Sequence, residues 1–381
     1  MPVQMRYRSA WMWLLVVVSG TAMAQICTPE RGYEGYTYIV YDQSDVDEIT
    51  AKCTTVNGSI AMAYNYTGGF HLPNIRNVTR SIDWVQSGHF GSFPNTTSVD
   101  LPDLEFLGGS LGLYSLPTLQ SVTAPKLETV GWSTEIGYAR EVDLRSLVES
   151  EYLQVRGNVS TLRLDSLRQV RQRMLICNWD ECDPEKSPHG SLDLSLPALH
   201  DVGHLLLKGR FSSLGTPKLT NITGVGPGFY GIQVLTAGGP PIDLSFPELK
   251  YIRYASLFLE GNIASISIPS IRNLTVWLTV NAYDGLDINL PFEEADTITL
   301  SGNISSVQFP NLKSVDTLQV NTVASLDCEA FEETIRTATN TSKYQVNCRA
   351  KNSSSRLGLN LGAEIAFASA VGVVFGLAMS Y

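Results

Sequence analysis

A degenerate repeat runs through the middle of this 381-residue chain and restricts its fold more than any other feature. Three segments, 153–167, 257–271 and 298–312, share one fifteen-residue frame. The frame holds a short alternating strand, a Gly-Asn pair, a second short strand and a closing apolar-x-x-apolar element, usually with Pro second. Segment 205–219 fits the same frame with Arg210 in place of Asn. Because self-similarity at a fixed period is typical of repeat architectures, the sequence predicts an array of stacked units.

The closing element sets the length of one unit. Its last residue recurs every twenty residues at Leu127, Leu147 and Leu167. Two longer steps carry extra residues at 177–190 and 224–239, which we expect to be inserted loops. A period near twenty is too short for a pair of helices, and it fits one coil of a solenoid.

Within each unit, apolar and polar residues alternate, as in 191–196 and 297–300. This alternation indicates strands that bury one face. Pro lacks a donor N–H and belongs where a strand ends at a corner, while the Gly of Gly-Asn allows a positive φ at the opposite corner. We therefore predict a mainly β solenoid around a column of Leu, Ile and Val.

A solenoid needs caps, because stacked coils leave both ends of their core open. The two clearest helical stretches, 44–53 and 328–337, lie near the ends of the repeat region. Six cysteines accompany the repeats, and fifteen pairings of them are possible. Nearest-neighbour pairing needs no long-range crossing and would close both caps. We therefore favour the pairs Cys27–Cys53, Cys177–Cys182 and Cys328–Cys348.

Both ends of the chain carry the features of processing signals. Arg6 and Arg8 precede an apolar run and a small-residue cleavage pattern, which together indicate a secretory signal peptide. At the other end, small residues and a polar spacer precede a short uncharged tail. This order favours a glycosylphosphatidylinositol (GPI) attachment signal over the alternative, a transmembrane anchor. The predicted segments are a signal peptide (1–24), an ectodomain (25–348), a linker (349–364) with attachment at Asn352 or Ser353, and a removed tail (365–381).

Ten Asn-x-Ser/Thr sequons occur along the chain. In a secreted protein such sites carry glycans only where they face solvent. Asn352 is also a candidate for anchor attachment. The other nine are the predicted N-glycosylation sites: Asn57, Asn65, Asn77, Asn95, Asn158, Asn221, Asn273, Asn303 and Asn340.

The order of these features resembles a known family. A disulfide-closed helical cap followed by leucine-rich-repeat-like coils is similar to the receptor L-domain. With the GPI signal and the sequons, the chain resembles the fungal GPI-anchored cell-wall organisation family, which includes extracellular-matrix and sporulation-specific wall proteins. The supporting motifs are Cys53 followed by Gly-Ser-Ile at 58–60, the Phe-Pro-x-Leu-x-x-Val unit at 309–315, and Gly-Asn-Ile turns at Gly261 and Gly302. The resemblance implies a role in wall integrity and morphogenesis and supplies no catalytic residues.

Two acidic clusters are candidate catalytic sites. The first comprises Asp180, Glu181 and Asp183, with His189 nearby. Adjacent side chains of an extended segment point to opposite sides, so we interpret this cluster as the tip of a solvated loop. The second cluster, at 293–296, stands where a corner is expected, and we interpret it as a wide turn.

Two cysteines and two histidines are candidate zinc ligands. Thiols of a secreted protein usually form disulfides, and the spacing of the candidate ligands fits no standard zinc site. The candidates are Cys177, Cys182, His189 and His200. We therefore expect no metal, no cofactor and no enzymatic activity.

Aromatic side chains are the remaining candidates for ligand binding, because their faces stack on sugar rings. Packing in the core or caps is the alternative role for most of them. The candidates are Tyr33, Tyr36, Tyr38, Tyr41, Trp84, Phe90, Phe93, Trp132, Trp179 and Trp277.

Together these features predict a right-handed β-solenoid of leucine-rich-repeat-like coils, held by GPI at the extracellular face of the plasma membrane. The family resemblance implies that this is the surface or the cell wall of a fungus. Wall polysaccharide or other wall proteins are the expected partners, besides the lipid of the outer leaflet. Nucleic acid is excluded, because the net charge of −10 repels phosphate backbones. The alternatives are a carbohydrate-active enzyme of the β-helix type and a ligand-binding, receptor-like ectodomain.

Overall fold

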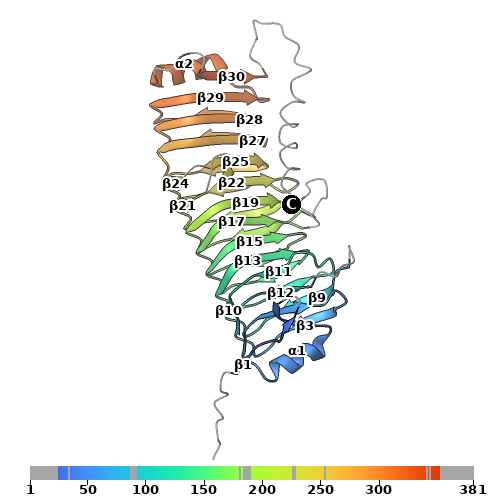
Figure 1. The fold of residues 1–381 in the computed structure, drawn as a ribbon. Helices are drawn as coiled ribbons and strands as arrows, with labels where there is room; N and C mark the ends of the chain where they lie inside the picture. The colour runs from blue at the N-terminus through green and yellow to red at the C-terminus, as the bar shows by residue number, and fades with distance from the viewer. Residues whose placement is uncertain are drawn as a thin grey trace, which may run out of the picture.

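Stacked parallel strands build the protein into a long β-solenoid of about twelve turns, which confirms the predicted fold class (Figure 1). The hand of the winding and the kinship with leucine-rich repeats stay predictions. No helix in the described part of the chain is long and apolar enough to cross a membrane. The predicted signal peptide, attachment site and tail lie outside the described residues. The computed structural model describes residues 25–32, 35–85, 92–179, 182, 190–224, 229–252, 255–339, 342 and 345–351.

Twenty-one of the described strands form one large sheet. The strands of this sheet stack in two rows along the solenoid axis. In each coil the chain first forms two residues of one row, which we call the short row. It then bends and forms a longer stretch of the second row, which we call the main row. The short row contains β1 (Ile26–Cys27), β4 (Thr55–Val56), β7 (Asn77–Val78), β10 (Phe106–Leu107), β21 (Asn221–Ile222) and β24 (Tyr251–Ile252). The main row contains β3 (Gly35–Val40), β5 (Ser59–Met62), β8 (Ile82–Trp84), β11 (Leu111–Leu113), β22 (Phe229–Thr236) and β25 (Ala255–Gly261). The strands that span both rows are β13 (Thr129–Gly137), β15 (Glu149–Arg156), β17 (Gln169–Cys177), β19 (Asp201–Gly209), β27 (Asn273–Asn289), β28 (Glu294–Gln308) and β29 (Ser314–Thr322).

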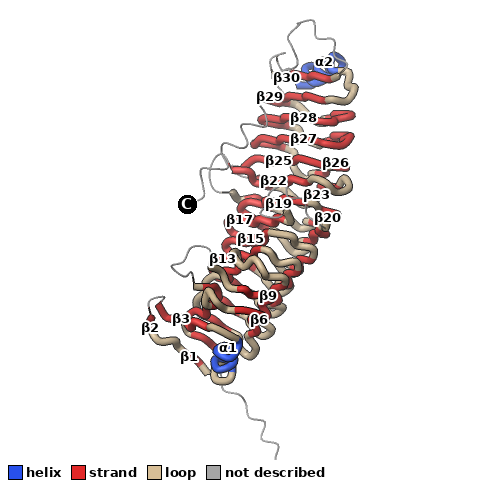
Figure 2. The backbone as a smooth tube through the Cα atoms, turned by 90° about the vertical axis from the view of Figure 1, so that its right-hand side faces the viewer, coloured by secondary structure: helices blue, strands red, loops and turns tan. Residues whose placement is uncertain are grey.

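A third row of strands, the back row, stacks along the same axis (Figure 2). The final residues of β27 and β28 continue this row, where Asn289 pairs with Gln308. The other strands of the back row are β6 (Thr67–His71), β9 (Asn95–Asp100), β12 (Ser121–Thr123), β14 (Glu141–Asp143), β16 (Thr161–Arg163), β18 (Leu192–Ser195), β20 (Phe211–Gly215), β23 (Ile242–Ser245) and β26 (Ile263–Ser267).

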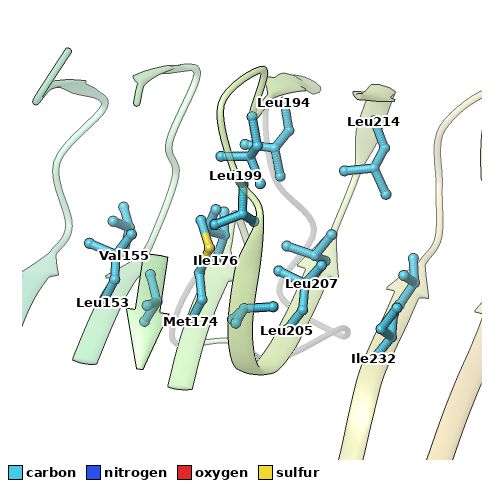
Figure 3. Packing of buried hydrophobic residues seen from close by; sticks show 14 of the residues in the cluster. Leu153, Val155, Met174, Ile176, Leu194, Leu199, Leu205, Leu207, Leu214 and Ile232 are labelled. Atoms are coloured by element: carbon cyan, nitrogen blue, oxygen red, sulfur yellow. The ribbon is translucent and has the colours of Figure 1, made fainter. Parts of the chain in front are cut away.

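The core is a continuous column of apolar side chains between the rows. Along β18, Leu192 and Leu194 are buried whereas the residues between and after them are exposed. On the main row, Leu153 and Val155 of β15 point inward in the same way (Figure 3). One cluster of buried apolar residues extends from Val40 to Cys348. Each fully buried aliphatic side chain of this kind contributes about 1.5–3 kcal/mol of transfer free energy.

The Leu-Pro-x-Leu element is a four-residue turn at the corner between the back and short rows. The Leu199 N–H donates to the Leu196 carbonyl at 3.3 Å, and both side chains are fully buried. Pro197 holds the second position, where its fixed φ suits such a turn. The same bond joins Leu119 to Leu116 at 3.0 Å. The spacing of the two apolar residues therefore follows from a turn that buries its first and last side chains.

The Gly of the Gly-Asn pair needs a positive φ, as predicted. Gly261 has φ 121° and Gly302 has φ 91°. A Cβ on Gly261 would lie 1.6 Å from the Thr236 carbonyl oxygen of the preceding coil, and one on Gly302 would lie 2.0 Å from the Ala282 carbonyl oxygen. At Gly302 this corner is a bend inside the continuous strand β28.

Helices and disulfides cap both ends of the column, as predicted. Helix α1 (Gln43–Thr50) buries Val46 and Ile49 against the first coils. Helix α2 (Cys328–Thr339) buries Phe331 and Ile335 at the other end (Figure 1). A last strand, β30 (Val346–Ala350), pairs with β29, and β2 (Arg31–Gly32) pairs antiparallel with β3. The disulfides join Cys27 to Cys53, Cys177 to Cys182 and Cys328 to Cys348.

Two local predictions are wrong. The segment 224–239 is not an inserted loop, because β22 occupies 229–236 and pairs with β19 and β25 in the main row. The acidic segment 293–296 is not a wide turn, because β28 begins at Glu294 and only four residues separate it from the end of β27. There the buried Phe292 fills the corner, and the ammonium of Lys313, 2.6 Å from Glu293, lowers the pKa of that carboxyl.

The close approach at Gly261 can be tested with a matched pair of variants. We expect Gly261→Ala to lower the free energy of unfolding by about 2 kcal/mol or more, since the Cβ would meet a carbonyl and φ is positive. Gly215→Ala is the control, because nothing lies within 4 Å of its Cβ position. Urea unfolding followed by circular dichroism compares the two. Equal midpoints would contradict the tight corner.

Candidate functional site

The acidic and metal-ligating residues singled out in the sequence do not form a described site. Asp180, Glu181, Asp183 and His189 lie outside the described residues. Cys177 and Cys182 are bonded to each other, so neither sulfur is a free thiolate ligand. Across the described ranges, no group of three or more His, Cys, Asp or Glu is arranged to hold a metal ion.

Trp179, a candidate for sugar stacking, instead packs in a small second core. Its side chain is 4% exposed and lies with Leu175 and Cys177. The partly buried Leu206 and Leu235, from neighbouring strands, complete this cluster. These strand residues stand on the outer side of the main row, so Trp179 covers the sheet there.

Two adjoining cavities open on the outer side of the main row, over β8, β11, β13 and β15. Their volumes are about 320 Å³ and 270 Å³. Because Trp132, Ser133 and Glu135 line both, the cavities join into one depression, which we call the aromatic groove. The other residues that line it are Asp83, Trp84, Ser110, Gly112, Tyr114, Tyr152, Leu153, Gln154 and Arg173.

Aromatic rings from four successive coils flank the groove. Trp84 lies 5.3 Å from Phe93 and 6.3 Å from Tyr114, measured between ring centroids. Trp132 lies 6.0 Å from Tyr152. Although such rings usually favour burial, Tyr114 is 52% and Trp132 is 57% exposed. The groove therefore presents two pairs of partly open aromatic faces along the solenoid axis.

A bulge sets the position of Trp132. The register between β13 and β15 shifts between Val130 and Ser133, where the chain turns from the short row into the main row. The Trp132 N–H donates to the Gly109 carbonyl of the coil before, at 3.0 Å, which fixes the backbone at this bend. A Cβ on Gly131 would lie 2.3 Å from the Gly108 carbonyl oxygen, so only Gly allows this approach. The indole is thus held on a rigid corner.

Hydroxyl groups line up along one side of the groove. The Ser133 hydroxyl donates to the Ser110 hydroxyl at 3.0 Å, and the Ser110 N–H donates to the Ser81 hydroxyl at 3.0 Å. At the next coil, the Tyr152 hydroxyl donates to the side-chain oxygen of Gln172. These groups supply both donors and acceptors beside the aromatic faces.

Two carboxylates face the same cavity. Asp83, Gly112 and Glu135 follow one another across β8, β11 and β13, because Ile82 pairs with Leu111 and Gly112 pairs with Glu135. Two strand spacings place the backbones of Asp83 and Glu135 about 9.6 Å apart. Gly112 contributes no side chain between them, and its Cβ position lies 3.2 Å from the Asp83 Cβ.

Three cations continue the outer side of the main row beyond the groove. Arg173 lines the groove next to Tyr152, its partner in the ladder. Arg156 and Lys208 flank Cys177 on the neighbouring strands. Partial desolvation by neighbouring residues, followed by the charge of Arg173, lowers the pKa of Arg156. Burial, with the charges of Arg156 and Arg173, lowers the pKa of Lys208.

The other aromatic candidates lie apart from the groove. Tyr36 and Tyr41 are exposed near α1, whereas Tyr38 packs partly against the core. Trp277 is 60% exposed on β27 of the same row, at the other end of the solenoid. Tyr33 and Phe90 lie outside the described residues.

Sequence reasoning identified Trp84 and Trp132 but missed the other residues of the groove, among them four acidic and aromatic residues. They are separated in the chain and do not cluster in any short window. The signal that could have identified them is their outward position in the alternation of inward and outward residues, on the strands of successive coils. These residues are Asp83, Tyr114, Glu135 and Tyr152.

The sequons avoid the main row. All eight sequon asparagines that the structure describes are exposed or half-buried, as glycosylation requires. Four lie on or beside the short row, and four lie in turns after the main row or on the back row. The first four are Asn57, Asn77, Asn221 and Asn273; the others are Asn65, Asn95, Asn158 and Asn303. Asn340 lies outside the described residues. Glycans at the eight described sites would leave the outer side of the main row uncovered.

No family model, no curated protein and no solved structure matches this chain.

Proposed function

We propose that the protein is a non-enzymatic glycoprotein of the cell surface that binds a polysaccharide chain in the aromatic groove. The observation that carries this proposal is the exposure of Tyr114 and Trp132 beside Trp84 and Tyr152, on a face that holds none of the eight described sequons. Aromatic faces stack on the apolar faces of sugar rings, and the neighbouring hydroxyl and carboxyl groups accept and donate hydrogen bonds.

The shape of the groove favours a polymer over a small ligand. Its aromatic residues come from β8 to β15, so they follow the solenoid axis over three strand spacings, about 14 Å. The groove is open and shallow, whereas pockets for small molecules enclose most of their ligand. An elongated chain of sugars fits such a surface.

The proposed setting is the wall of a fungal cell. The predicted signal peptide, GPI attachment at Asn352 or Ser353 and glycans would place the solenoid outside the plasma membrane, or in the wall itself. Binding of wall polysaccharide by many anchored copies would link the wall to the membrane. This role agrees with the resemblance to the fungal cell-wall organisation family.

Polysaccharide binding can be tested with Trp132→Ala and Tyr114→Ala. Base–aromatic stacking is worth about 1–3 kcal/mol, and we expect sugar stacking of comparable size, so the double variant should bind at least tenfold more weakly. The measurement is the dissociation constant of the purified protein for soluble wall polysaccharides. Trp277→Ala is the matched control, since Trp277 is equally exposed but lies outside the groove. Unchanged binding by the double variant would contradict the proposal.

A second candidate function, glycoside hydrolysis, rests on Asp83 and Glu135. Inverting glycosidases hold their two carboxyl groups about 6.5–9.5 Å apart, with room for a water between them. The two strand spacings between these residues, and the missing side chain at Gly112, are compatible with that range. One carboxyl would protonate the leaving oxygen while the other activated the water.

An assay for reducing ends separates the two candidates. We expect the purified protein to release no more reducing ends from wall polysaccharides than the double variant Asp83→Asn, Glu135→Gln. Both substitutions preserve shape and hydrogen bonding, so binding should change little. Release that the double variant loses while it still binds would replace the binding function with hydrolysis.

A further inference from the structure

Three cations beside the groove, Arg156, Arg173 and Lys208, indicate which class of polysaccharide it binds. Arg173 lines the groove itself. The Arg156 guanidinium donates a hydrogen bond to the side-chain oxygen of Gln154, at 2.7 Å, and Gln154 also lines the groove. Lys208 extends this group by two strands, opposite Arg156 across Cys177. Arg173 therefore stands level with Tyr152, whereas Arg156 and Lys208 lie level with Cys177, four residues further along the strands of the main row.

These three charges are not compensated by ion pairs. Within the ranges that the structure describes, no salt bridge joins Arg156, Arg173 or Lys208 to a carboxylate. On the same coils, Arg145 pairs with Asp143 on the back row and Arg171 pairs with Glu149 on the short row. The chain is acidic overall, so a group of three cations without an ion pair among the described residues stands out against its net charge of −10.

Mutual repulsion destabilises this arrangement unless an anion occupies it. The pKa of Lys208 and that of Arg156 are both lowered, first by burial and then by neighbouring cations. Glu135 is the acidic residue whose charge favours the charged form of Arg156. An anionic ligand that reaches both guanidinium groups would form charge-assisted hydrogen bonds, which are about twice as strong as neutral ones.

We propose that Arg156, Arg173 and Lys208 form an anion subsite that selects an acidic polysaccharide, whose sugar rings stack in the aromatic groove while its acidic groups meet the three cations. This inference rests on the proposed function and names its ligand class. Carboxylate groups of uronic acids and sulfate or phosphate esters share the required chemistry. Arginine forks bind each of these anions in bidentate fashion.

The test compares three probes on the purified protein: polygalacturonate, dextran sulfate and the neutral glucan laminarin. The variant Arg156→Gln, Arg173→Gln, Lys208→Gln should bind the acidic probe at least tenfold more weakly and bind laminarin unchanged. Arg163→Gln is the matched control, because Arg163 is an exposed cation of the back row. Added salt should weaken acidic-probe binding in the wild type more than in the triple variant.

Each outcome decides a separate point. Loss confined to polygalacturonate identifies a carboxylate, and loss confined to dextran sulfate identifies an ester; both support the subsite. Laminarin bound as tightly as the acidic probes, with no effect of the triple variant, would overturn the subsite and leave the proposed function intact. Acidic-probe binding that ignores Trp132→Ala would also overturn it, because the cations would then act outside the groove. If none of the probes binds, the proposed function itself fails.

Discussion

The parallel register between successive coils is the constraint on which the rest of this structure depends. Each residue lies one strand spacing from its equivalent in the next coil, so inward residues form the apolar column and outward residues form lines along the axis. Met174 and Leu205 meet in the column for the same reason that Tyr152 and Arg173 meet on the surface. A shift of one residue would exchange the two faces, because the side-chain period of a strand is two. The caps protect this register at its open ends.

The same stacking of coils explains how residues that are distant in the sequence form one ligand-binding surface. Trp84, Tyr114, Trp132 and Tyr152 come from different coils, yet all four line the two joined cavities. Rigid positioning reduces the entropy lost on binding, which favours affinity for an extended polymer. The sequons lie on other parts of the coil, where bound glycans would not cover the groove. Fold, glycan placement and proposed binding are thus consistent with one another.

Periodicity in the sequence predicted the column and the corners, because each coil repeats the same physical requirement. The disulfide pairs were predicted separately, from nearest-neighbour pairing of the cysteines. Leu196 and Leu199 recur because every corner buries the ends of one turn. The groove could not be predicted in this way, since its residues do not repeat. Their alignment depends on the register shift before Ser133 and on coil lengths that differ along the chain. The error at 224–239 has the same origin: the distance between corners gives the length of a coil but not the place of its extra residues.

Hydroxyl-radical footprinting tests the central claim, that the groove binds polysaccharide, most directly. Exposed aromatic side chains are oxidised in the free protein, and mass spectrometry reports each of them separately. With saturating polysaccharide, the account predicts protection of Tyr114 and Trp132, while the equally exposed Tyr251 and Trp277 stay reactive. Protection of Trp277 with continued oxidation of Trp132 would place the ligand elsewhere and contradict the account.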